Sequence, residues 1–530
     1  WSCESPQLYN AEVVVTADGM VVDSLTEQFG IRSLEFSPEF GFKLNGKKIF
    51  LQGNANHHDL GALGATCYDK AIERMMLQLK SFGYNCIRCS HNPYSDSFAR
   101  IADRVGILVV DELTDKWSDN DYWGGRQPFT HIWHKLITEW IKRDRNRPSI
   151  ILWSLGNELQ IREGWAGFEG TNDWGITTYN IFNQLVKRWD HTRLTTVAMF
   201  PARAGAITRH DKEFNDYLVP PELACATEVA SFNYQSDKYD AYLKYRPDLI
   251  LFQSEAETSN LLQPYYNMDK ERMVGIAYWG SVEYWGESNK WPKKGWNYSF
   301  FDHTMRPYPQ AYLIKSAFMP EIPEVHIGVV DAAGAESVSW NDVTVGRMAL
   351  NECWNHTPGS RRSLFTFTNA HSVELLVNGQ SMGIQENDTT RANLRNMIYW
   401  KDVPYGNGGS VVAIARDKSG KEVARHRIET AGKAVALRIE AETPTDWKAD
   451  GMDLQYINVT VIDKKGRPVW DYNEPLTLQM EGAARLVALD NGDHYTDELF
   501  HGITSKRMYQ GRMQIILRSD QEAGDRKSVV

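Results

Sequence analysis

Between about residues 48 and 320, short apolar runs rich in β-branched residues alternate with longer segments of helical periodicity. This alternation is typical of βα units that build a parallel sheet. The predicted strands are 49–56, 85–90, 107–112, 149–158, 194–199, 229–234, 249–255 and 275–280. Eight strands with interleaved helices over roughly 270 residues match the usual size of a closed (β/α)8 barrel. A doubly wound sheet fits less well, because it usually has fewer strands and a glycine-rich phosphate loop.

After Pro320 the helical periodicity ends, and short alternating runs are interrupted by Gly, Pro, Asn and Asp at roughly ten-residue spacing, which indicates β-sandwiches. We therefore expect a multidomain chain, a (β/α)8 TIM barrel flanked by immunoglobulin-like β-sandwich domains. The predicted units are the C-terminal part of one sandwich at 1–36, the barrel at 37–320, a sandwich at 321–433 and a second C-terminal sandwich at 434–530.

Composition excludes several classes of function. A net charge of -10 argues against the basic surface that non-specific nucleic-acid binding needs. The sequence has no run of about 18 apolar residues, so no membrane span is expected. Six cysteines are few for 530 residues, and Cys86 and Cys89 lie at i and i+3 on a predicted strand, which sends them to opposite faces. We therefore predict neither a metal site nor any other cofactor.

Tryptophan is unevenly distributed, since twelve of the 18 tryptophans fall between residues 117 and 296. Flat indole rings pack against the C–H faces of sugars and offer an N–H donor, so this enrichment favours a sugar-binding cleft. Large aromatic core residues explain a share of the same pattern.

The active site of a (β/α)8 barrel lies at the carboxyl ends of its strands, so the residues that close each predicted strand are the candidates. They are His57, His58, Arg88, His91, Asp111, Asn157, Glu158, Tyr234, Glu255 and Trp279. Asp111 is a candidate for binding a sugar hydroxyl, with a helix N-cap or a buried ion pair as the alternatives.

Two carboxylates stand out, because Glu158 and Glu255 each end an apolar run that must be buried. Paired carboxylates in an aromatic-rich cleft fit glycoside hydrolysis, in which one acid protonates the leaving oxygen and the other attacks or activates water. Two other classes stay open. One is a carbohydrate-binding protein that lost catalysis, and the other is an adhesive protein in which the sandwiches matter most.

The residues also resemble a known family. IILWSLGNE, NCIRCSHNPYSDSFARIADRVGILVVDE and IAYWGSVEYWGES are similar in order and spacing to blocks of glycoside hydrolase family 2, the β-galactosidase and β-glucuronidase family, including its Bacteroides-type β-galactosidases. The resemblance implies a retaining mechanism through a covalent glycosyl-enzyme. It also implies that Glu158 is the general acid/base, that Asn157 holds the 2-hydroxyl and that Tyr234 hydrogen-bonds the nucleophile.

The nucleophile is predicted as Glu255, because relatives place it after an apolar run and a small residue, here Ser254. Glu257 stays an alternative, because an extended strand would put both glutamates on one face. Arg88 is expected to orient a carboxylate, His57, His58 and His91 to face hydroxyls, and Trp279 to form the floor of the sugar subsite. Some relatives bind magnesium through a histidine after the third strand. The stretch VVDELTDKWSDN has no histidine, so that metal is not expected here.

We expect a terminal β-galactoside as substrate, with β-glucuronides behind it. Glucuronide-specific relatives use an Asn-x-Lys element, whereas Asn289 and Lys290 are adjacent here, with Lys293 and Lys294 nearby. Other expectations are a periplasmic or secreted location and a carbohydrate partner, with a homo-oligomer left open. The family's N-terminal jelly roll has no counterpart in the sequence, which starts in the pattern of the following sandwich.

Overall fold

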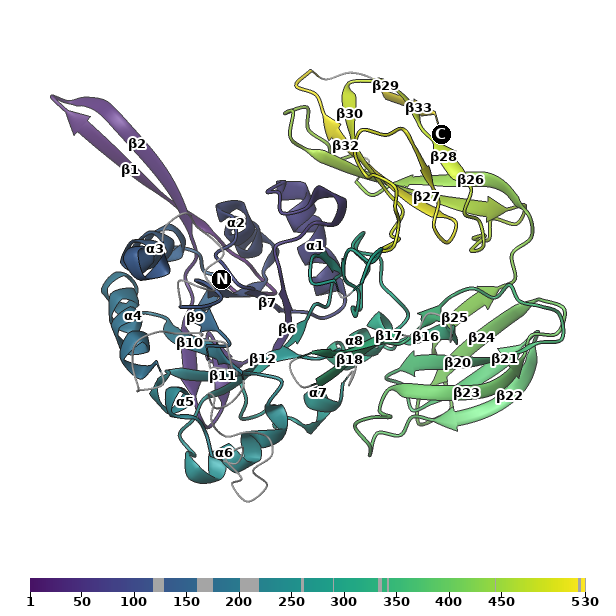
Figure 1. The fold of residues 1–530 in the computed structure, drawn as a ribbon, viewed down its shortest axis with the longest axis horizontal. Helices are drawn as coiled ribbons and strands as arrows, with labels where there is room; N and C mark the ends of the chain where they lie inside the picture. The colour runs from purple at the N-terminus through teal and green to yellow at the C-terminus, as the bar shows by residue number, and fades with distance from the viewer. Residues whose placement is uncertain are drawn as a thin grey trace.

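The computed structural model describes residues 1–117, 128–159, 175–200, 219–258, 262–288, 290–331, 336–340, 343–443, 445–522 and 526–529. A closed eight-stranded parallel barrel forms its centre, in the order β10-β11-β12-β13-β6-β7-β8-β9 (Figure 1). The strands are β6 (Leu51–Asn56), β7 (Cys86–Cys89), β8 (Leu108–Glu112), β9 (Ile150–Asn157), β10 (Leu194–Met199), β11 (Val229–Asn233), β12 (Leu251–Ala256) and β13 (Gly275–Trp279). The predicted fold class is confirmed.

Helices surround the barrel where the sequence has 3.6-residue periodicity. They are α1 (Asp69–Ser81), α2 (Asp96–Val105), α3 (Phe129–Asp144), α4 (Ile176–Trp189), α5 (Glu222–Ala226), α6 (Tyr239–Tyr245), α7 (Gln263–Asn267) and α8 (Ala311–Phe318). Local sequence sets the ends of α2, because Ser95 accepts a hydrogen bond from the Phe98 amide at 3.2 Å and Gly106 adopts the left-handed conformation that ends the helix.

The barrel strands alternate between two apolar layers. Leu108 and Val110 point into the barrel and pack with Phe252, whereas Val109 packs outward with helix residues such as Ile141. This period of two is the ordinary alternation of a β-strand. It also decides which polar residue at a strand end can enter the barrel mouth.

Short strands precede the barrel. The hairpin β1 (Tyr9–Ala17) and β2 (Met20–Phe29) projects from it with most of its residues exposed, and β3 (Leu34–Ser37), β4 (Gly41–Leu44) and β5 (Lys47–Lys48) form a small sheet (Figure 1). Between the barrel and α8 lies the two-stranded ribbon of β14 (Tyr284–Trp285) and β15 (Gly295–Trp296).

A β-sandwich follows α8. Two four-stranded sheets, β19-β16-β20-β23 and β22-β21-β24-β25, enclose a core that includes Trp354 and Trp400. Its strands are β16 (Val325–Val330), β19 (Leu350–Asn351), β20 (Arg361–Thr368), β21 (Ser372–Val377), β22 (Gln380–Glu386), β23 (Met397–Pro404), β24 (Ser410–Arg416) and β25 (Glu422–Glu429), with a separate ribbon of β17 (Glu336–Trp340) and β18 (Val343–Arg347).

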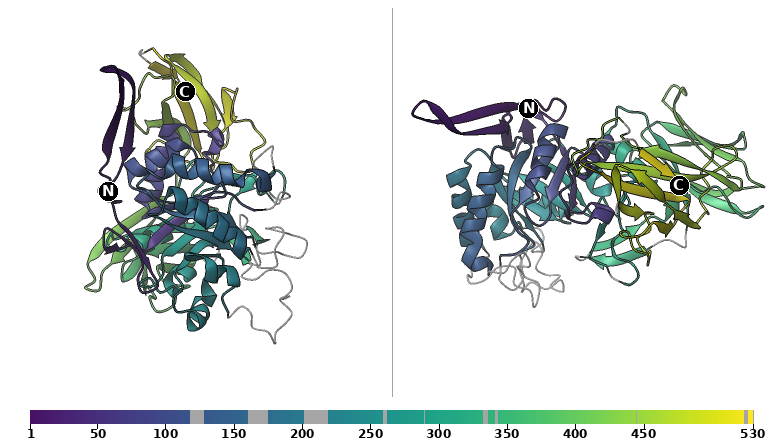
Figure 2. Two further views of the ribbon diagram at one scale, coloured as in Figure 1. Left: turned by 90° about the vertical axis from the view of Figure 1, so that its left-hand side faces the viewer. Right: turned by 90° about the horizontal axis from the view of Figure 1, so that it is seen from above.

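The last part of the chain is also all β, and Figure 2 shows both β units on one side of the barrel. Its main sheet has the order β26-β27-β32-β30, and two ribbons pair β28 with β31 and β29 with β33. The bounds are β26 (Ala434–Ala441), β27 (Leu454–Asp463), β28 (Pro475–Thr477), β29 (Gln479–Gly482), β30 (Ala484–Asp490), β31 (Ser505–Arg507), β32 (Arg512–Ser519) and β33 (Arg526–Val529). We call this part the C-terminal sandwich; the predicted domain boundaries stay predictions.

A buried ionic network joins the barrel to the C-terminal sandwich. His303 lies between two carboxylates, with Nδ1 3.1 Å from Glu283 Oε2 and Nε2 2.9 Å from Asp490 Oδ1. Burial works to lower the pKa of His303, but Asp490 and Glu283 outweigh it and hold the pKa well above its ordinary value. The imidazolium of His303 therefore bridges the two carboxylates inside the interface, and His494 Nδ1 also lies 3.2 Å from Glu283 Oε2.

Replacing His303 should destabilise this junction. His303→Gln removes the imidazolium that bridges the buried carboxylates of Glu283 and Asp490, which we expect to cost about 3 kcal/mol of unfolding free energy. Because the folded-state pKa is raised, the stabilisation is complete below about pH 6.5 and is lost as pH rises through the folded-state pKa. Calorimetry from pH 6 to pH 10 measures this difference, and the exposed His371→Gln serves as control. A difference between wild type and variant that grows with pH would contradict the assignment.

Candidate active site

Both strands that carry the predicted carboxylates are interrupted by a bulge near their carboxyl ends. In β9, one extra residue shifts the register to β10 after Ser154, so Asn157 pairs with Ala198. In β12, one extra residue after Gln253 shifts the register to both neighbours, so Glu255 pairs with Asn233. Bulges at barrel rims re-aim side chains. The bulge in β9 lies immediately before Glu158, and the bulge in β12 lies at Glu255. Each bulge shifts the alternation of side chains between the inside and the outside of the barrel.

Glu255 is buried, and both of its carboxylate oxygens accept hydrogen bonds. Arg88 Nη1 donates to Oε1 at 2.6 Å, and the Tyr234 hydroxyl donates to Oε2 at 2.7 Å. His91 Nε2 lies 4.0 Å from Oε1. These groups fix the orientation of the carboxylate.

Arg88 is fully buried and connects three neighbouring groups. Its Nε and Nη2 donate to Glu112 at 3.1 and 2.8 Å, and Nη2 also donates to Asn157 Oδ1 at 2.9 Å. Burial works to lower the pKa of Arg88, but Glu112 and Glu255 outweigh it and raise the pKa. For Glu112 the effect is reversed, because burial would raise the pKa while Arg88 and His91 lower it.

Glu158 lies in a different electrostatic environment. Asn233 Nδ2 donates to Glu158 Oε1 at 3.2 Å and also to Asn157 Oδ1 at 3.0 Å. Burial raises the pKa of Glu158 to about 7, and the charge of Glu255 adds to this effect. This raised pKa favours the protonated form that a general acid requires.

Aromatic and imidazole rings line the mouth beside Glu255. His91 stacks on Trp279 with centroids 5.3 Å apart, and His57 meets Trp279 edge-on at 5.1 Å and Tyr284 at 5.0 Å. Burial works to lower the pKa of His57, but Glu287, 3.6 Å away, outweighs it and raises the pKa. The rings provide the apolar and donor surfaces that suit a sugar ring.

Two predicted site residues lie elsewhere. Asp111 has the outward phase of Val109, accepts a hydrogen bond from Trp140 Nε1 at 2.6 Å and faces α3, so the structure does not bring it to the mouth. Burial and the neighbouring Asp144 raise the pKa of Asp111 well above its usual range. His58 turns away from its neighbour His57, because its Nε2 lies 2.7 Å from the Thr66 carbonyl oxygen and its ring packs on Tyr94.

Glu257 also separates from Glu255. It lies beyond the end of β12 and is buried. Burial, Tyr84 and Glu257 together raise the pKa of Tyr278, which belongs to the outer layer. In the mouth, Arg88 and Tyr234 donate hydrogen bonds to Glu255.

Sequence reasoning missed two side chains that complete the site. Glu112 binds Arg88, the Ser154 hydroxyl at 2.6 Å and His91 Nδ1 at 2.6 Å. Asn233 links Glu158 to Asn157. Glu112 can be predicted by counting alternate residues along β8, because it lies two residues after the inward-pointing Val110.

Two groups in the described residues have donor atoms close enough to hold a metal ion. They are Glu283, His303 and His494 at the junction with the C-terminal sandwich, and His326, Glu352 and His426 in the middle β unit. In both, the histidines contact carboxylates or backbone amides directly. Neither group includes a residue of the barrel mouth.

The coupling between the two glutamates can be measured directly. Glu255→Gln removes a neighbouring negative charge, so the pKa of Glu158 should fall below about 7. Carbon NMR of glutamate-labelled protein follows this titration, with Glu158→Gln identifying the signal. Glu257→Gln is the matched control, two residues away on the same segment. A larger shift in that control would show that Glu257 is the charge facing Glu158.

Comparison with known proteins agrees with this geometry. The description "Glycosyl hydrolases family 2, TIM barrel domain" matches residues 39–270, "Glycosyl hydrolases family 2" matches 1–32, and "Glycoside hydrolase family 2 C-terminal domain 5" matches 437–527. Residues 359–424 match a domain of unknown function.

Individual relatives cover almost the whole chain. The β-galactosidase BoGH2A of Bacteroides ovatus is 27% identical over 99% of this chain and 65% of its own length. A putative β-glucuronidase of Formosa agariphila is 23% identical over 90% of this chain and 60% of its own length. The chain thus spans less than two thirds of these curated relatives.

A solved structure of a family 2 glycosyl hydrolase from Bacteroides cellulosilyticus aligns with a TM-score of 0.86 and 28% identity, covering 100% of this chain and 68% of that one. The barrel, the residues at its mouth and the matches along the chain lead to one conclusion: the chain belongs to glycoside hydrolase family 2.

Proposed function

We propose that this chain carries the active site of a retaining exo-β-glycosidase that hydrolyses terminal non-reducing β-D-galactosides. The main support for this proposal is the contrast between the surroundings of the two carboxylates. Glu255 is bound by a buried arginine and a tyrosine, whereas Glu158 has an amide donor and a pKa of about 7. Two acids in such different environments suit one nucleophile and one proton donor.

In the first step, Glu255 attacks the anomeric carbon while Glu158 gives its proton to the departing glycosidic oxygen. Arg88 and Tyr234 hold the two oxygens of Glu255 so that the attacking lone pair faces the sugar. A covalent bond forms between Glu255 and the sugar, and the aglycone leaves as a neutral alcohol.

In the second step, the ionised Glu158 takes a proton from water, and the resulting nucleophile displaces Glu255 from the anomeric carbon. Two displacements at one carbon give net retention of configuration. The Oδ1 atom of Asn157 accepts hydrogen bonds from Arg88 and Asn233, so the sugar's 2-hydroxyl would bind at its Nδ2, in place of the 3.1 Å contact with Asp115 Oδ1. Trp279 and His91 form the adjoining wall.

The choice of galactoside rests on the β-galactosidase name of the relative that covers 99% of this chain. It also rests on the segment 289–294, in which Asn289 and Lys290 are adjacent and do not form an Asn-x-Lys element. The Lys293 ammonium lies 4.0 Å from the centre of the Tyr298 ring, and Lys294 lies 5.2 Å from that of Trp291. Asn289 lies outside the described residues. A glucuronide, the substrate named for other relatives, would need a cation at the sugar's carboxylate.

Covalent trapping tests the whole proposal. A 2-deoxy-2-fluoro β-galactoside with a dinitrophenol leaving group should label the wild type once, and peptide mass spectrometry should place the label on Glu255. Glu158→Gln should still be labelled, because this leaving group needs no proton, whereas Glu255→Gln should not. A label on Glu257 would show that Glu257 is the nucleophile. Labelling only by the matching glucuronide would show that the substrate is a β-glucuronide. No label with either reagent would contradict retaining catalysis.

The two acidic residues that end β8 provide a matched pair. Glu112→Gln weakens the contacts that hold Arg88 and His91, so we expect kcat/KM for an aryl galactoside to fall about 100-fold. Asp111→Asn keeps an acceptor for Trp140 and should change kcat/KM by less than about twofold, because this side chain faces α3. Steady-state kinetics on both variants decides the matter, and a larger loss in Asp111→Asn would show that the phase assignment is wrong.

A further inference from the structure

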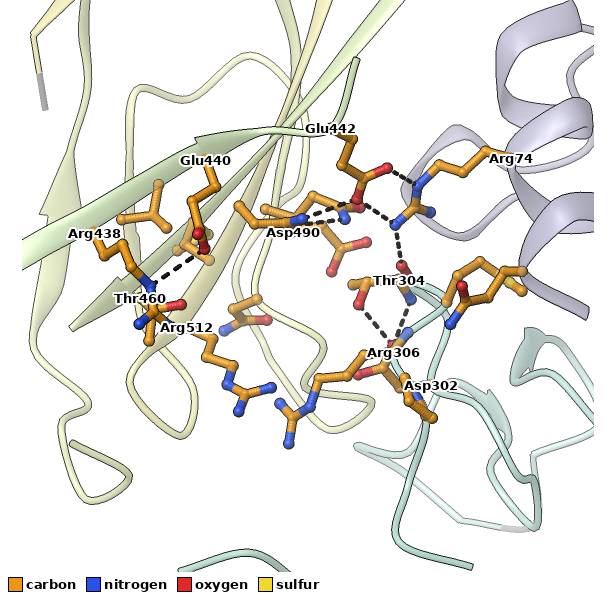
Figure 3. A pocket seen from close by; sticks show the side chains of 18 residues that line it. Arg74, Asp302, Thr304, Arg306, Arg438, Glu440, Glu442, Thr460, Asp490 and Arg512 are labelled. Carbon is orange, nitrogen blue, oxygen red and sulfur yellow. Dashed lines mark hydrogen bonds and ion pairs between the residues drawn. The ribbon is translucent and has the colours of Figure 1, made fainter. Parts of the chain in front are cut away.

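A polar cavity of about 410 Å³ lies between the barrel and the C-terminal sandwich (Figure 3). One wall comes from α1 and from residues 302–307, and the other from β26, β27, β32 and the end of β30. Its size falls within the range of small-molecule sites in proteins. None of the residues that bind Glu158 or Glu255 lines it.

Two arginines of this cavity have carboxylate partners and hold the walls together. Arg74 donates to both oxygens of Glu442 at 2.6 and 2.9 Å and to the Thr304 carbonyl oxygen at 2.8 Å. Arg438 lies 3.2 Å from Glu440. These pairs account for the charges on that side of the cavity.

Arg306 and Arg512 are different. Arg306 Nη2 donates to a neutral amide oxygen, Gln510 Oε1, at 3.0 Å. Arg512 forms an ion pair with Glu352 only at 3.8 Å, and its buried Nε has no hydrogen-bond acceptor among the residues that the structure describes. Figure 3 shows the two guanidinium groups pointing toward one another.

Two like charges are thus held close together. Burial, followed by the charge of Arg306, lowers the pKa of Arg512 to about 9. Both guanidinium groups also pack on the ring of Trp470, with their central carbons 5.0 and 4.4 Å from its centre. The indole holds the two cations in place before any ligand arrives.

The other walls offer acceptors for hydroxyl groups. Asp302 accepts three hydrogen bonds within its own loop through Oδ1, and its side chain lines the cavity. The carboxylate of Glu440 and the hydroxyl of Thr460 also line the space. A ligand with one anionic group and several hydroxyls matches this distribution.

We propose that this cavity is an accessory binding site for an acidic sugar, whose carboxylate or sulfate ester lies between Arg306 and Arg512. Guanidinium groups bind both oxyanions in paired geometry, and a second fork from another domain strengthens the contact. The site is separate from the barrel mouth, so the proposal stands apart from the proposed catalytic function.

Isothermal titration of the full chain tests it with D-glucuronate, D-galacturonate and D-glucose 6-sulfate, and with D-glucose as the neutral probe. The acids should bind saturably and glucose should not. Tighter binding of the uronates would identify a carboxylate as the preferred anionic group, and tighter binding of glucose 6-sulfate would identify a sulfate ester. Arg512→Gln and Arg306→Gln should each weaken binding by about tenfold or more.

Controls keep the result specific. Arg438→Gln removes a cavity arginine that already has a carboxylate partner, and it should change the affinity less than about twofold. Arg512→Lys keeps the charge without the fork and should lie between wild type and Arg512→Gln. Melting temperatures of all variants check folding, and hydrolysis of an aryl galactoside should be unchanged in Arg512→Gln.

Three outcomes would overturn the proposal. They are the absence of saturable binding of the acids to wild type, equal affinity in wild type and both glutamine variants, and inorganic sulfate binding as tightly as glucose 6-sulfate. The last would show an anion site that does not recognise a sugar.

Discussion

The buried guanidinium of Arg88 is the contact on which the barrel mouth depends. It comes from β7 and reaches Glu112 at the end of β8, Asn157 at the end of β9 and Glu255 on β12. Removing this cation would leave two buried carboxylates facing one another, which the low-dielectric interior would not tolerate. One side chain thus keeps strands from both sides of the barrel in register at their carboxyl ends.

The two candidate catalytic acids have different surroundings. Arg88 donates directly to Glu255, whereas Asn233 donates to Glu158. Burial and the charge of Glu255 raise the pKa of Glu158 to about 7, so Glu158 is the acid suited to donate a proton. The division of labour therefore follows from the different surroundings of two identical side chains: burial and a neighbouring carboxylate at Glu158, and a buried arginine at Glu255.

Much of this could be predicted from the sequence, and the rest fails for identifiable reasons. All eight barrel strands can be predicted from short apolar runs that alternate with helical segments, because parallel strands are buried on both faces. Asp111 is a candidate from the end of the third strand, but counting alternate residues from Val110 places Glu112 in the mouth and Asp111 against α3. The bulges in β9 and β12 are different, because an extra residue in a strand leaves no local composition signal. Glu255 and Glu257 could not be separated by alternation, because residues two apart in an extended strand share one face.

The ribbon that carries Tyr284 and Trp285 has a wider consequence. Trp285 stacks on His494 of the C-terminal sandwich with centroids 5.0 Å apart, and its neighbour Tyr284 packs against His57 in the mouth. Part of the rim of the barrel is therefore anchored to a unit that begins more than 100 residues after the barrel's last strand. Sequence drift in that distant unit can reshape the entrance while every residue inside the barrel stays the same, which gives such a chain a route to new aglycone preferences.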